Sequence, residues 1–384
     1  MIGGDCDPAF AAVRDVFEEN FRARDEVGAA VCVVVGERVV ADLWGGHQDE
    51  ARTTPWRRDT LINAYSVAKG VTAMLVLQLV SEGRLDLDAP VTRLWPEYGA
   101  AGKEGTTLRM MLCHQAGQPA LRAVQPPDAW RHWDRLTAAL AEQAPYWEPG
   151  RDHGYHVNTL GFLVGEQVRR VTGRRFGEAL RERLTGPLGA DYHIGLPDAE
   201  HARVAPVLGR TTEVAGEEAM RLFVGESDDP ERDRMVRHTY FNPPGLAGSG
   251  SVNTRAWMRA EIPSTNGHGT ARGVAALYAA VLAGRAGIAD AVLAEATRTQ
   301  SEGLDRVIER PSRFGLGFQL HQPKRPIGRG PNAFGHYGHG GSLSFADPDA
   351  GLAFGYVTNL PGPRWQAPRT LALVDAAYGA LGGG

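Results

Sequence analysis

Lysine is nearly absent from this chain of 384 residues. The 41 basic residues include only three lysines, Lys69, Lys103 and Lys324, and the rest are arginine. Arginine keeps its proton in proteins, whereas a lysine loses its proton when burial lowers its pKa far enough. A lysine kept in such a chain is therefore a candidate for a role that needs a neutral amine.

Long apolar runs and paired cysteines are missing as well. The longest apolar runs, near Val27–Val35 and Val71–Val80, are too short to span a bilayer. The first ten residues, MIGGDCDPAF, lack the basic and apolar regions of a signal peptide. Three widely spaced cysteines, Cys6, Cys32 and Cys113, predict reduced thiols and not a disulfide framework. We therefore expect a cytoplasmic protein that does not bind membranes.

Strong charge of one sign and the common cofactor motifs are also lacking. A net charge of −4 gives no general attraction to nucleic acid, so no nucleic-acid partner is expected. The pairs His153/His156 and His336/His339 occur without an HExxH or Cys-x-x-Cys motif, so we expect no metal and no cofactor. None of the serines stands in Gly-x-Ser-x-Gly, which argues against an α/β-hydrolase.

Apolar patterns predict strands at both ends of the chain and helices between them. A hairpin is expected over residues 29–46, and further strands over 314–320, 339–347 and 351–359. Helical spacing is typical of Pro8–Arg24 and of a last helix over about 365–381. The acidic and basic run SDDPERDRMVR (227–237) is expected to be a solvated loop.

These elements predict an α+β fold with an antiparallel sheet flanked by helices. Both ends of the chain would build the sheet, so residues 1–83 and 201–384 would form one discontinuous α/β domain. Residues 84–200, which are mostly helical in pattern, would form an inserted helical domain. Val67–Val80 is apolar nearly all round and predicts a buried central helix that ends at Gly83.

Ser66 and Lys69 stand three residues apart at the predicted start of this buried helix, within NAYSVAKGVTAM (63–74). This spacing places both side chains on one helix face, beside the N–H groups that favour negative charge. A serine hydroxyl becomes a nucleophile when a neighbouring base takes its proton. Lysine can be that base if burial lowers its pKa from about 10.4, whereas arginine cannot.

Two further segments offer the other groups that such chemistry requires. Tyr155 follows the turn WEPG (147–150) and precedes an apolar helix, so it is a candidate for carrying a proton to a leaving group. The glycines of GHYGHGGS (335–342) allow backbone N–H groups to approach a bound oxygen, as an oxyanion hole requires. Each segment alone also fits a purely structural role, as a half-buried tyrosine or a Gly-rich strand edge.

Together the three segments resemble the motifs Ser-x-x-Lys, Tyr-x-Asn and Lys-Thr-Gly of class C β-lactamases and DD-peptidases. The matching residues, in order, are Ser66-Val67-Ala68-Lys69, Tyr155 and His336-Tyr337-Gly338. Residues 108–121, 153–166 and 261–279 support the resemblance, which covers nearly the whole chain. The chain looks most similar to the family VIII carboxylesterases, which share the fold of serine β-lactamases and penicillin-binding proteins.

The resemblance implies a role for each matched residue. Ser66 would be the acylated nucleophile, Lys69 its base and Tyr155 the proton shuttle. The backbone N–H groups of Ser66 and His339 would form the oxyanion hole, with His336 and Gly338 at the substrate site.

The sequence departs from the motifs where β-lactamases hold the substrate's amide and carboxylate. Val157 occupies the asparagine position of Tyr-x-Asn, and Asn158 follows one residue later. His336 and Tyr337 replace the lysine and threonine of the third motif, and a neutral histidine offers no fixed positive charge. We therefore expect a small-molecule carboxylic ester as substrate. The alternatives are a transacylase, a β-lactamase or DD-peptidase-type amide hydrolase using the same site, and a non-catalytic ligand-binding relative.

Overall fold

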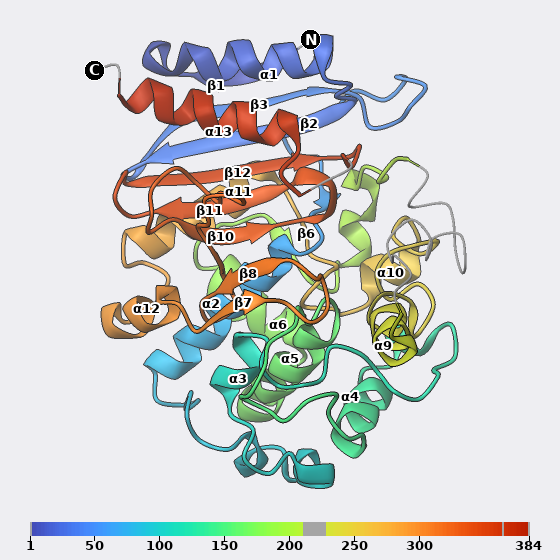
Figure 1. The fold of residues 1–384 in the computed structure, drawn as a ribbon. Helices are drawn as coiled ribbons and strands as arrows, with labels where there is room; N and C mark the ends of the chain where they lie inside the picture. The colour runs from blue at the N-terminus through green and yellow to red at the C-terminus, as the bar shows by residue number, and fades with distance from the viewer. Residues whose placement is uncertain (1, 210–227, 363–364, 383–384) are drawn as a thin grey trace.

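The computed structural model describes residues 2–209, 228–362 and 365–382. Within these residues one large antiparallel sheet has the strand order β1-β3-β2-β12-β11-β10-β9-β8-β7. Strands from the two ends of the chain meet in its middle, where β2 pairs with β12 and Val31 lies opposite Tyr356 (Figure 1). The predicted fold class, an antiparallel sheet built from both chain ends and flanked by helices, is confirmed.

The strands of the large sheet fall at the two ends of the sequence. Their bounds are β1 (Ile2–Cys6), β2 (Gly28–Val35), β3 (Arg38–Gly46), β7 (Ser301–Leu304), β8 (Pro311–Phe314), β9 (Gln319–Leu320), β10 (Phe334–Tyr337), β11 (Leu343–Asp347) and β12 (Leu352–Thr358). A smaller sheet has the order β4 (Ile62–Asn63), β6 (His268–Gly269) and β5 (Tyr192–His193). The edge strand β1 was not predicted, because IGGDC contains a single β-branched residue and gives no strand pattern.

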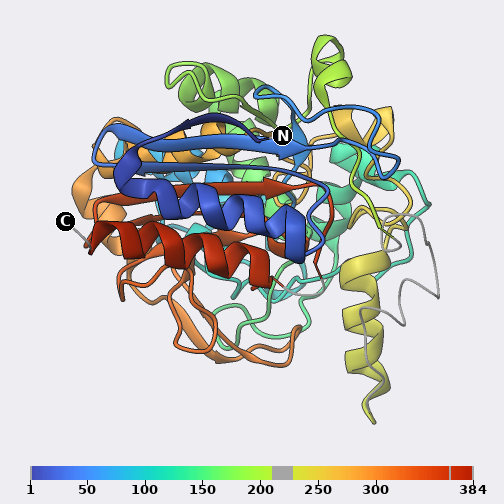
Figure 2. The ribbon, with the colours of Figure 1, turned by 90° about the horizontal axis from the view of Figure 1, so that it is seen from above.

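Helices cover both faces of the large sheet. On one face α1 (Ala11–Ala23) and α13 (Pro368–Leu381) lie side by side, as Figures 1 and 2 show. On the other face lie α2 (Val67–Ser81), which contacts β10, and α11 (Ala271–Leu282), which contacts β2, β11 and β12. Every residue of α2 from Val67 to Leu77 is buried, and Gly83 follows with a left-handed φ of 69°. The predicted central helix and its glycine stop are therefore confirmed.

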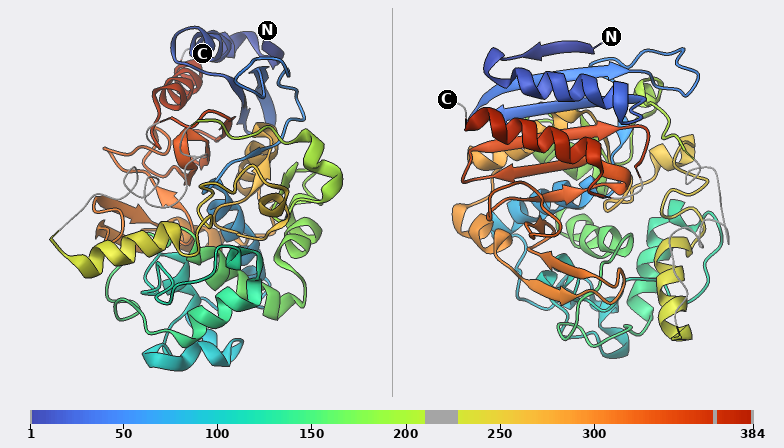
Figure 3. Two further views of the ribbon diagram at one scale, coloured as in Figure 1. Left: turned by 90° about the vertical axis from the view of Figure 1, so that its right-hand side faces the viewer. Right: turned by 45° about the horizontal axis from the view of Figure 1, so that its top comes forward.

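The region that packs beneath α2 is mostly helical (Figure 3). Its helices are α3 (Leu108–Leu112), α4 (Trp133–Glu142), α5 (Thr159–Thr172) and α6 (Phe176–Leu180), and later come α9 (Pro230–Phe241), α10 (Arg255–Arg259) and α12 (Asp290–Thr297). Short 3₁₀-helices lie at Pro8–Phe10, Val91–Arg93, Pro96–Gly102, Ala129–Arg131, Asp198–Arg203 and His339–Gly341, and a π-helical turn lies at Arg181–Thr185. Among the described helices, none combines the length and apolar character needed to cross a bilayer. The domain boundaries at 83/84 and 200/201 stay a prediction.

The expectation of a solvated loop over residues 227–237 is wrong from Pro230 onward, where α9 begins; residue 227 lies outside the described residues. Asp229 caps the helix by accepting hydrogen bonds from the backbone N–H groups of Glu231 and Arg232, at 3.0 and 3.1 Å. The signal is present in the sequence as Asp-Pro, an N-cap followed by proline at the first helical position. The abundance of charged residues hid this signal, because Met235 and Val236 are the only residues of 228–237 that are buried.

Candidate active site

Ser66 lies at the N-terminus of α2, directly after a turn with unusual backbone geometry. Tyr65 has a φ of 50°, in the left-handed region that non-glycine residues seldom adopt and that is often found at functional sites. Ser66 itself has helical dihedral angles, and its side chain caps no backbone N–H group. Its hydroxyl therefore remains available to Lys69, one helical turn later.

Lys69 is a fully buried lysine with three polar neighbours. Its Nζ lies 3.1 Å from Ser66 Oγ, 2.6 Å from the carbonyl oxygen of Val157 and 2.9 Å from that of Ser264. Burial lowers the pKa of Lys69 well below its ordinary value, and no carboxylate among the described residues offsets this effect. A neutral amine has two N–H bonds, which match the two carbonyl groups, and a lone pair, which is left for the hydroxyl proton of Ser66.

The ring of Tyr155 lies next to this amine. Lys69 Nζ is 4.7 Å from the ring centroid, and the rings of Phe314 and His336 stack on Tyr155 at centroid distances of 5.9 Å each. Burial raises the pKa of Tyr155, and the Ser66 side chain opposes this rise. No described residue makes a hydrogen bond of standard geometry to the Tyr155 hydroxyl, so Ser66 is close to the hydroxyl without a well-aligned bond.

His336, on β10, presents one ring nitrogen to the same space. Its Nδ1 lies 2.7 Å from the carbonyl oxygen of Tyr337, so Nδ1 carries the proton and Nε2 is an acceptor. Nε2 is buried and has no hydrogen-bond partner among the described residues. Burial and the nearby Lys69 lower the pKa of His336 well below its ordinary value, so the imidazole is neutral at pH 7. Buried polar atoms without a partner are rare, and a substrate can supply the missing partner here.

Tyr337 does not face the site, although it aligns with a substrate-holding threonine in the third motif. Neighbouring residues of a strand point to opposite faces, and Tyr337 packs in the core between the sheet and the helices α1 and α13. Its hydroxyl donates to the carbonyl oxygen of Pro326 at 3.1 Å. We conclude that Tyr337 contributes to packing and does not replace the threonine as a substrate ligand.

Gly338 brings the end of β10 against the turn that precedes Ser66. A Cβ atom at Gly338 would lie 2.2 Å from the carbonyl oxygen of Ala64, so only glycine allows this approach. The ring of the next residue, His339, contacts that of Tyr65 at a centroid distance of 5.3 Å. The backbone of 338–339 therefore runs beside that of 64–65, immediately before Ser66. Burial lowers the pKa of His339 to about 4, so this imidazole is also neutral at pH 7.

Asn158, one residue after the expected asparagine position, makes its hydrogen bonds to other parts of the protein. Asn158 Nδ2 donates to the carbonyl oxygen of Thr239 at 2.9 Å, and its Oδ1 accepts from the Thr265 hydroxyl at 2.8 Å. Asn158 thus ties α9 to the loop at 263–266, with both ends of its amide group engaged inside the protein. Val157 contributes its backbone carbonyl to Lys69, while its side chain packs in a small apolar cluster with Tyr155 and Phe314.

Sequence reasoning missed Asp305, a fully buried carboxylate that positions Tyr155. Its Oδ1 accepts hydrogen bonds from the backbone N–H groups of Tyr155, Val307 and Ile308, at 3.0, 2.9 and 3.1 Å. Its Oδ2 accepts from the Ser312 hydroxyl at 3.0 Å. Asp305 is far from Tyr155 in sequence and stands in no recognisable motif, so no sequence signal points to it.

The arrangement suits proton transfer among buried groups. Burial lowers the pKa of His114, which contacts the Tyr155 ring edge at 5.0 Å, well below its ordinary value. Burial likewise lowers the pKa of Lys69 and of His336 well below their ordinary values and raises that of Tyr155. With the amine neutral, a serine hydroxyl, an amine and a protonated phenol can pass a proton without a resident charge. The described residues contain no group of three or more histidine, cysteine or acidic side chains placed to hold a metal ion.

Comparisons with known proteins agree with this geometry. Residues 13–378 match the model of the Beta-lactamase family. The chain is 34% identical to the esterase/beta-lactamase LipL of Mycobacterium tuberculosis, over 93% of this chain and 83% of LipL. It superposes on a family VIII carboxylesterase with a TM-score of 0.89 and 38% identity, over 99% of this chain and 100% of the other. It also superposes on a penicillin-binding protein homolog from Caulobacter crescentus, with a TM-score of 0.88 and 40% identity, over 99% of this chain and 100% of the other.

The family match spans almost the whole chain, LipL matches over most of its length, and the two solved structures share the fold over their full length. The antiparallel sheet with flanking helices is therefore the β-lactamase/transpeptidase fold. The chain belongs to the beta-lactamase family and is a serine hydrolase of the β-lactamase-like type.

Proposed function

We propose that this protein hydrolyses carboxylic esters of small molecules through an acyl-enzyme on Ser66. The observation that carries the proposal is the environment of Lys69, whose Nζ contacts two carbonyl oxygens and the Ser66 hydroxyl while burial lowers its pKa. Such an amine is a base at neutral pH, and the hydroxyl 3.1 Å away is the group that it deprotonates.

In the acylation step, Ser66 Oγ attacks the ester carbonyl carbon and its proton passes to Lys69. The carbonyl oxygen becomes an oxyanion held by the backbone N–H groups of Ser66 and His339, an assignment supported by the close approach of Gly338 to Ala64. Tyr155 then donates its proton to the departing alkoxide and regains a proton from Lys69. The alcohol leaves, and the acyl group stays on Ser66.

Deacylation reverses these proton transfers with water in place of the alcohol. Tyr155 takes the proton of the attacking water and passes its own proton to Lys69, and Lys69 returns that proton to Ser66 Oγ as the acid leaves. The same acyl-enzyme passes its acyl group to an alcohol or amine if such a molecule outcompetes water. This is the transacylase alternative, and ester exchange on adding acceptor alcohols identifies it.

The neutral character of His336 favours esters over β-lactams. The similarity to a family VIII carboxylesterase points in the same direction, whereas the name of the esterase/beta-lactamase LipL includes both activities. The 40% identity to a penicillin-binding protein homolog keeps amide hydrolysis at the same site as the second candidate.

The test combines active-site labelling with a substrate screen. A fluorophosphonate is expected to label the peptide that contains Ser66, which separates a catalytic protein from a ligand-binding relative. p-Nitrophenyl esters of graded chain length are then compared with a chromogenic cephalosporin. Faster hydrolysis of the cephalosporin would replace the esterase proposal with a β-lactamase, and turnover of neither would favour the transacylase.

Replacing Tyr155 with phenylalanine is expected to reduce kcat about 10²–10⁴-fold with little change in KM. The variant keeps the ring that stacks on Phe314 and His336 and removes only the proton. Tyr98→Phe is the matched control, because the hydroxyl of Tyr98 is equally buried and lacks a described hydrogen-bond partner. A Tyr155→Phe variant altered only in KM would show that the phenol positions substrate and that another group carries the proton.

His336→Lys is expected to raise the ratio of cephalosporin to p-nitrophenyl acetate hydrolysis about ten- to a hundredfold. A charge-assisted hydrogen bond to the β-lactam carboxylate is worth about 1.5–3 kcal/mol. The comparison uses kcat/KM for both substrates, with His336→Met as the variant that removes the imidazole without adding charge. An equal ratio in the two variants would show that the missing charge does not determine the preference.

A further inference from the structure

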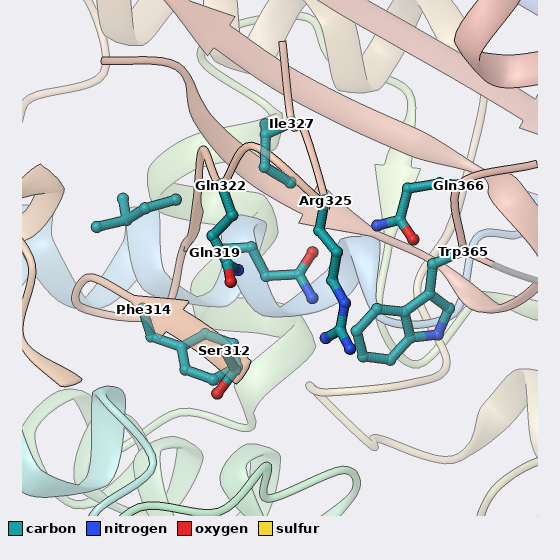
Figure 4. Close-up of a pocket in the computed structure, with 9 residues that line it drawn as sticks. Ser312, Phe314, Gln319, Gln322, Arg325, Ile327, Trp365 and Gln366 are labelled. Carbon is teal, nitrogen blue, oxygen red and sulfur yellow. The ribbon is translucent and has the colours of Figure 1, made fainter. Parts of the chain in front are cut away.

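Two aromatic rings that contact Tyr155 belong to the lining of a small pocket. Phe314 stacks on Tyr155 with an interplanar angle of 1°, and the Trp365 ring meets its edge at a centroid distance of 5.5 Å. Both rings also line the pocket, together with Arg325 and Gln319 (Figure 4). The pocket thus adjoins the group that we propose protonates the departing alcohol.

Arg325 is the only charged side chain that lines this pocket, within the described part of the chain. Figure 4 shows its side chain extending between Gln319 and Trp365, toward Ser312 and Phe314. The guanidinium is partly buried, and across the described residues no ion pair or side-chain hydrogen bond occupies it. Arg329, further along the same connection between β9 and β10, pairs with Asp375.

The nearest acidic group does not satisfy this charge. Asp305 is the one acidic side chain with an electrostatic effect on Arg325 among the described residues, and Arg310 adds a second positive charge. The carboxylate of Asp305 already accepts four hydrogen bonds, including those from Tyr155 and Ser312. A guanidinium beside a second arginine, with no acceptor of its own, favours an anion in the pocket.

The polar groups of the pocket suit a carboxylate oxygen. The free space holds about one water molecule, which is the size of one carboxylate oxygen and smaller than a whole carboxylate. Gln319 accepts a hydrogen bond from the Tyr337 backbone through Oε1, which leaves its amide NH₂ group as a donor. Gln366 lies on the same side (Figure 4). Arginine presents a planar fork that matches carboxylate geometry.

We propose that Arg325 binds a carboxylate carried by the alcohol part of the ester. The preferred substrates are then O-acylated hydroxy acids, in which the hydroxyl group is esterified and the carboxylate is free. The inference rests on the proposed function, because Tyr155 marks the side from which the alcohol leaves. It concerns a carboxylate several bonds from the ester oxygen. A β-lactam carboxylate has a different place, because it is attached next to the scissile nitrogen.

The test compares two esters that differ only in this charge, 4-acetoxybenzoate and its methyl ester. Arg325→Met is expected to lower kcat/KM for 4-acetoxybenzoate about ten- to a hundredfold and to leave the methyl ester within about twofold. Arg325→Lys, which keeps the charge without the fork, is expected to lie between wild type and Arg325→Met. Turnover of the methyl ester reports that each variant is folded and active.

Lys324→Met is the matched control, because Lys324 is the neighbouring residue, is exposed and lies outside the pocket. If Lys324→Met loses as much kcat/KM for 4-acetoxybenzoate as Arg325→Met does, the preference for the carboxylate comes from long-range attraction, and the proposal is overturned. An equal loss for both esters in Arg325→Met would overturn it as well, as would a loss confined to phenyl monoadipate, whose carboxylate is on the acyl side. If wild type does not hydrolyse the methyl ester through Ser66, the proposed function fails; if only the dependence on Arg325 is missing, this inference alone fails.

Discussion

Ser66→Ala is expected to reduce ester hydrolysis by about 10⁴-fold or more while the protein stays folded. The substitution removes one oxygen at the start of α2, and that oxygen caps no backbone N–H group. Its close partner is Lys69 Nζ, which keeps the carbonyl groups of Val157 and Ser264. We therefore expect a melting temperature near that of wild type and no initial burst of p-nitrophenol from p-nitrophenyl acetate.

The matched control is Ser81→Ala, near the other end of the same helix. Ser81 Oγ donates to the carbonyl oxygen of Leu77 at 2.8 Å, so its loss tests the effect of removing a hydroxyl from α2. This control should retain turnover and fluorophosphonate labelling. Substantial activity in Ser66→Ala, with no labelling of that peptide in wild type, would remove the acyl-enzyme from the proposal.

The local part of the site is predictable from the sequence. Ser66 and Lys69 meet because residues three apart share a helix face, and Lys69 is buried because the helix around it is apolar on all sides. The grouping of Tyr155 and His336 with this pair cannot be predicted from periodicity, because they come from distant loops and strands. It follows from the order of the three motifs and from the resemblance that they carry.

The remaining contacts depend on tertiary packing that no local pattern encodes. Asp305 reaches Tyr155 because the connection after β7 folds over the turn before α5. Phe314 and Trp365 enclose the Tyr155 ring from strand β8 and from the segment before α13. Tyr337 shows that a motif match can also mislead. Tyr337 aligns with the threonine of the third motif, but the alignment does not say which face of β10 its side chain occupies.

The rarity of lysine is not by itself a sign of catalysis, as Lys103 shows. Lys103 is also fully buried, and its Nζ donates to three backbone carbonyl oxygens, those of Ala100, Ala141 and Gln143, at 2.6, 3.0 and 2.5 Å. Three carbonyl acceptors use all three N–H bonds of an ammonium group and leave no lone pair. Lys69 has only two carbonyl acceptors and a hydroxyl in the third place. We therefore expect the set of acceptors, and not burial, to distinguish a base from a structural cation.

This difference predicts opposite results for the same substitution at the two lysines. Lys69→Arg should reduce kcat/KM about 10²–10⁴-fold, nearly as much as Lys69→Ala, because a guanidinium keeps its proton and cannot accept that of Ser66. Lys103→Arg should lower the melting temperature, since a larger group must fit among three fixed carbonyls, but retain the turnover of each folded molecule. Near-UV circular dichroism establishes the folded fraction for both. A Lys69→Arg variant with most of its activity would mean that position 69 contributes charge and not basicity.

The pH dependence of wild type supplies the second measurement on Lys69. Burial lowers the pKa of Lys69, so the neutral, active form persists well below the ordinary pKa of lysine. Protonation removes the lone pair, and kcat/KM should therefore fall as the pH is lowered through this pKa and rise toward mildly alkaline pH. The pKa of His336 is lowered too, so protonation of this imidazole could also reduce the rate at low pH. The profile is therefore repeated with His336→Met, in which a fall in rate caused by Lys69 must remain. A profile that is flat or falls between about pH 6 and 8 in both proteins would contradict the role of Lys69 as the base.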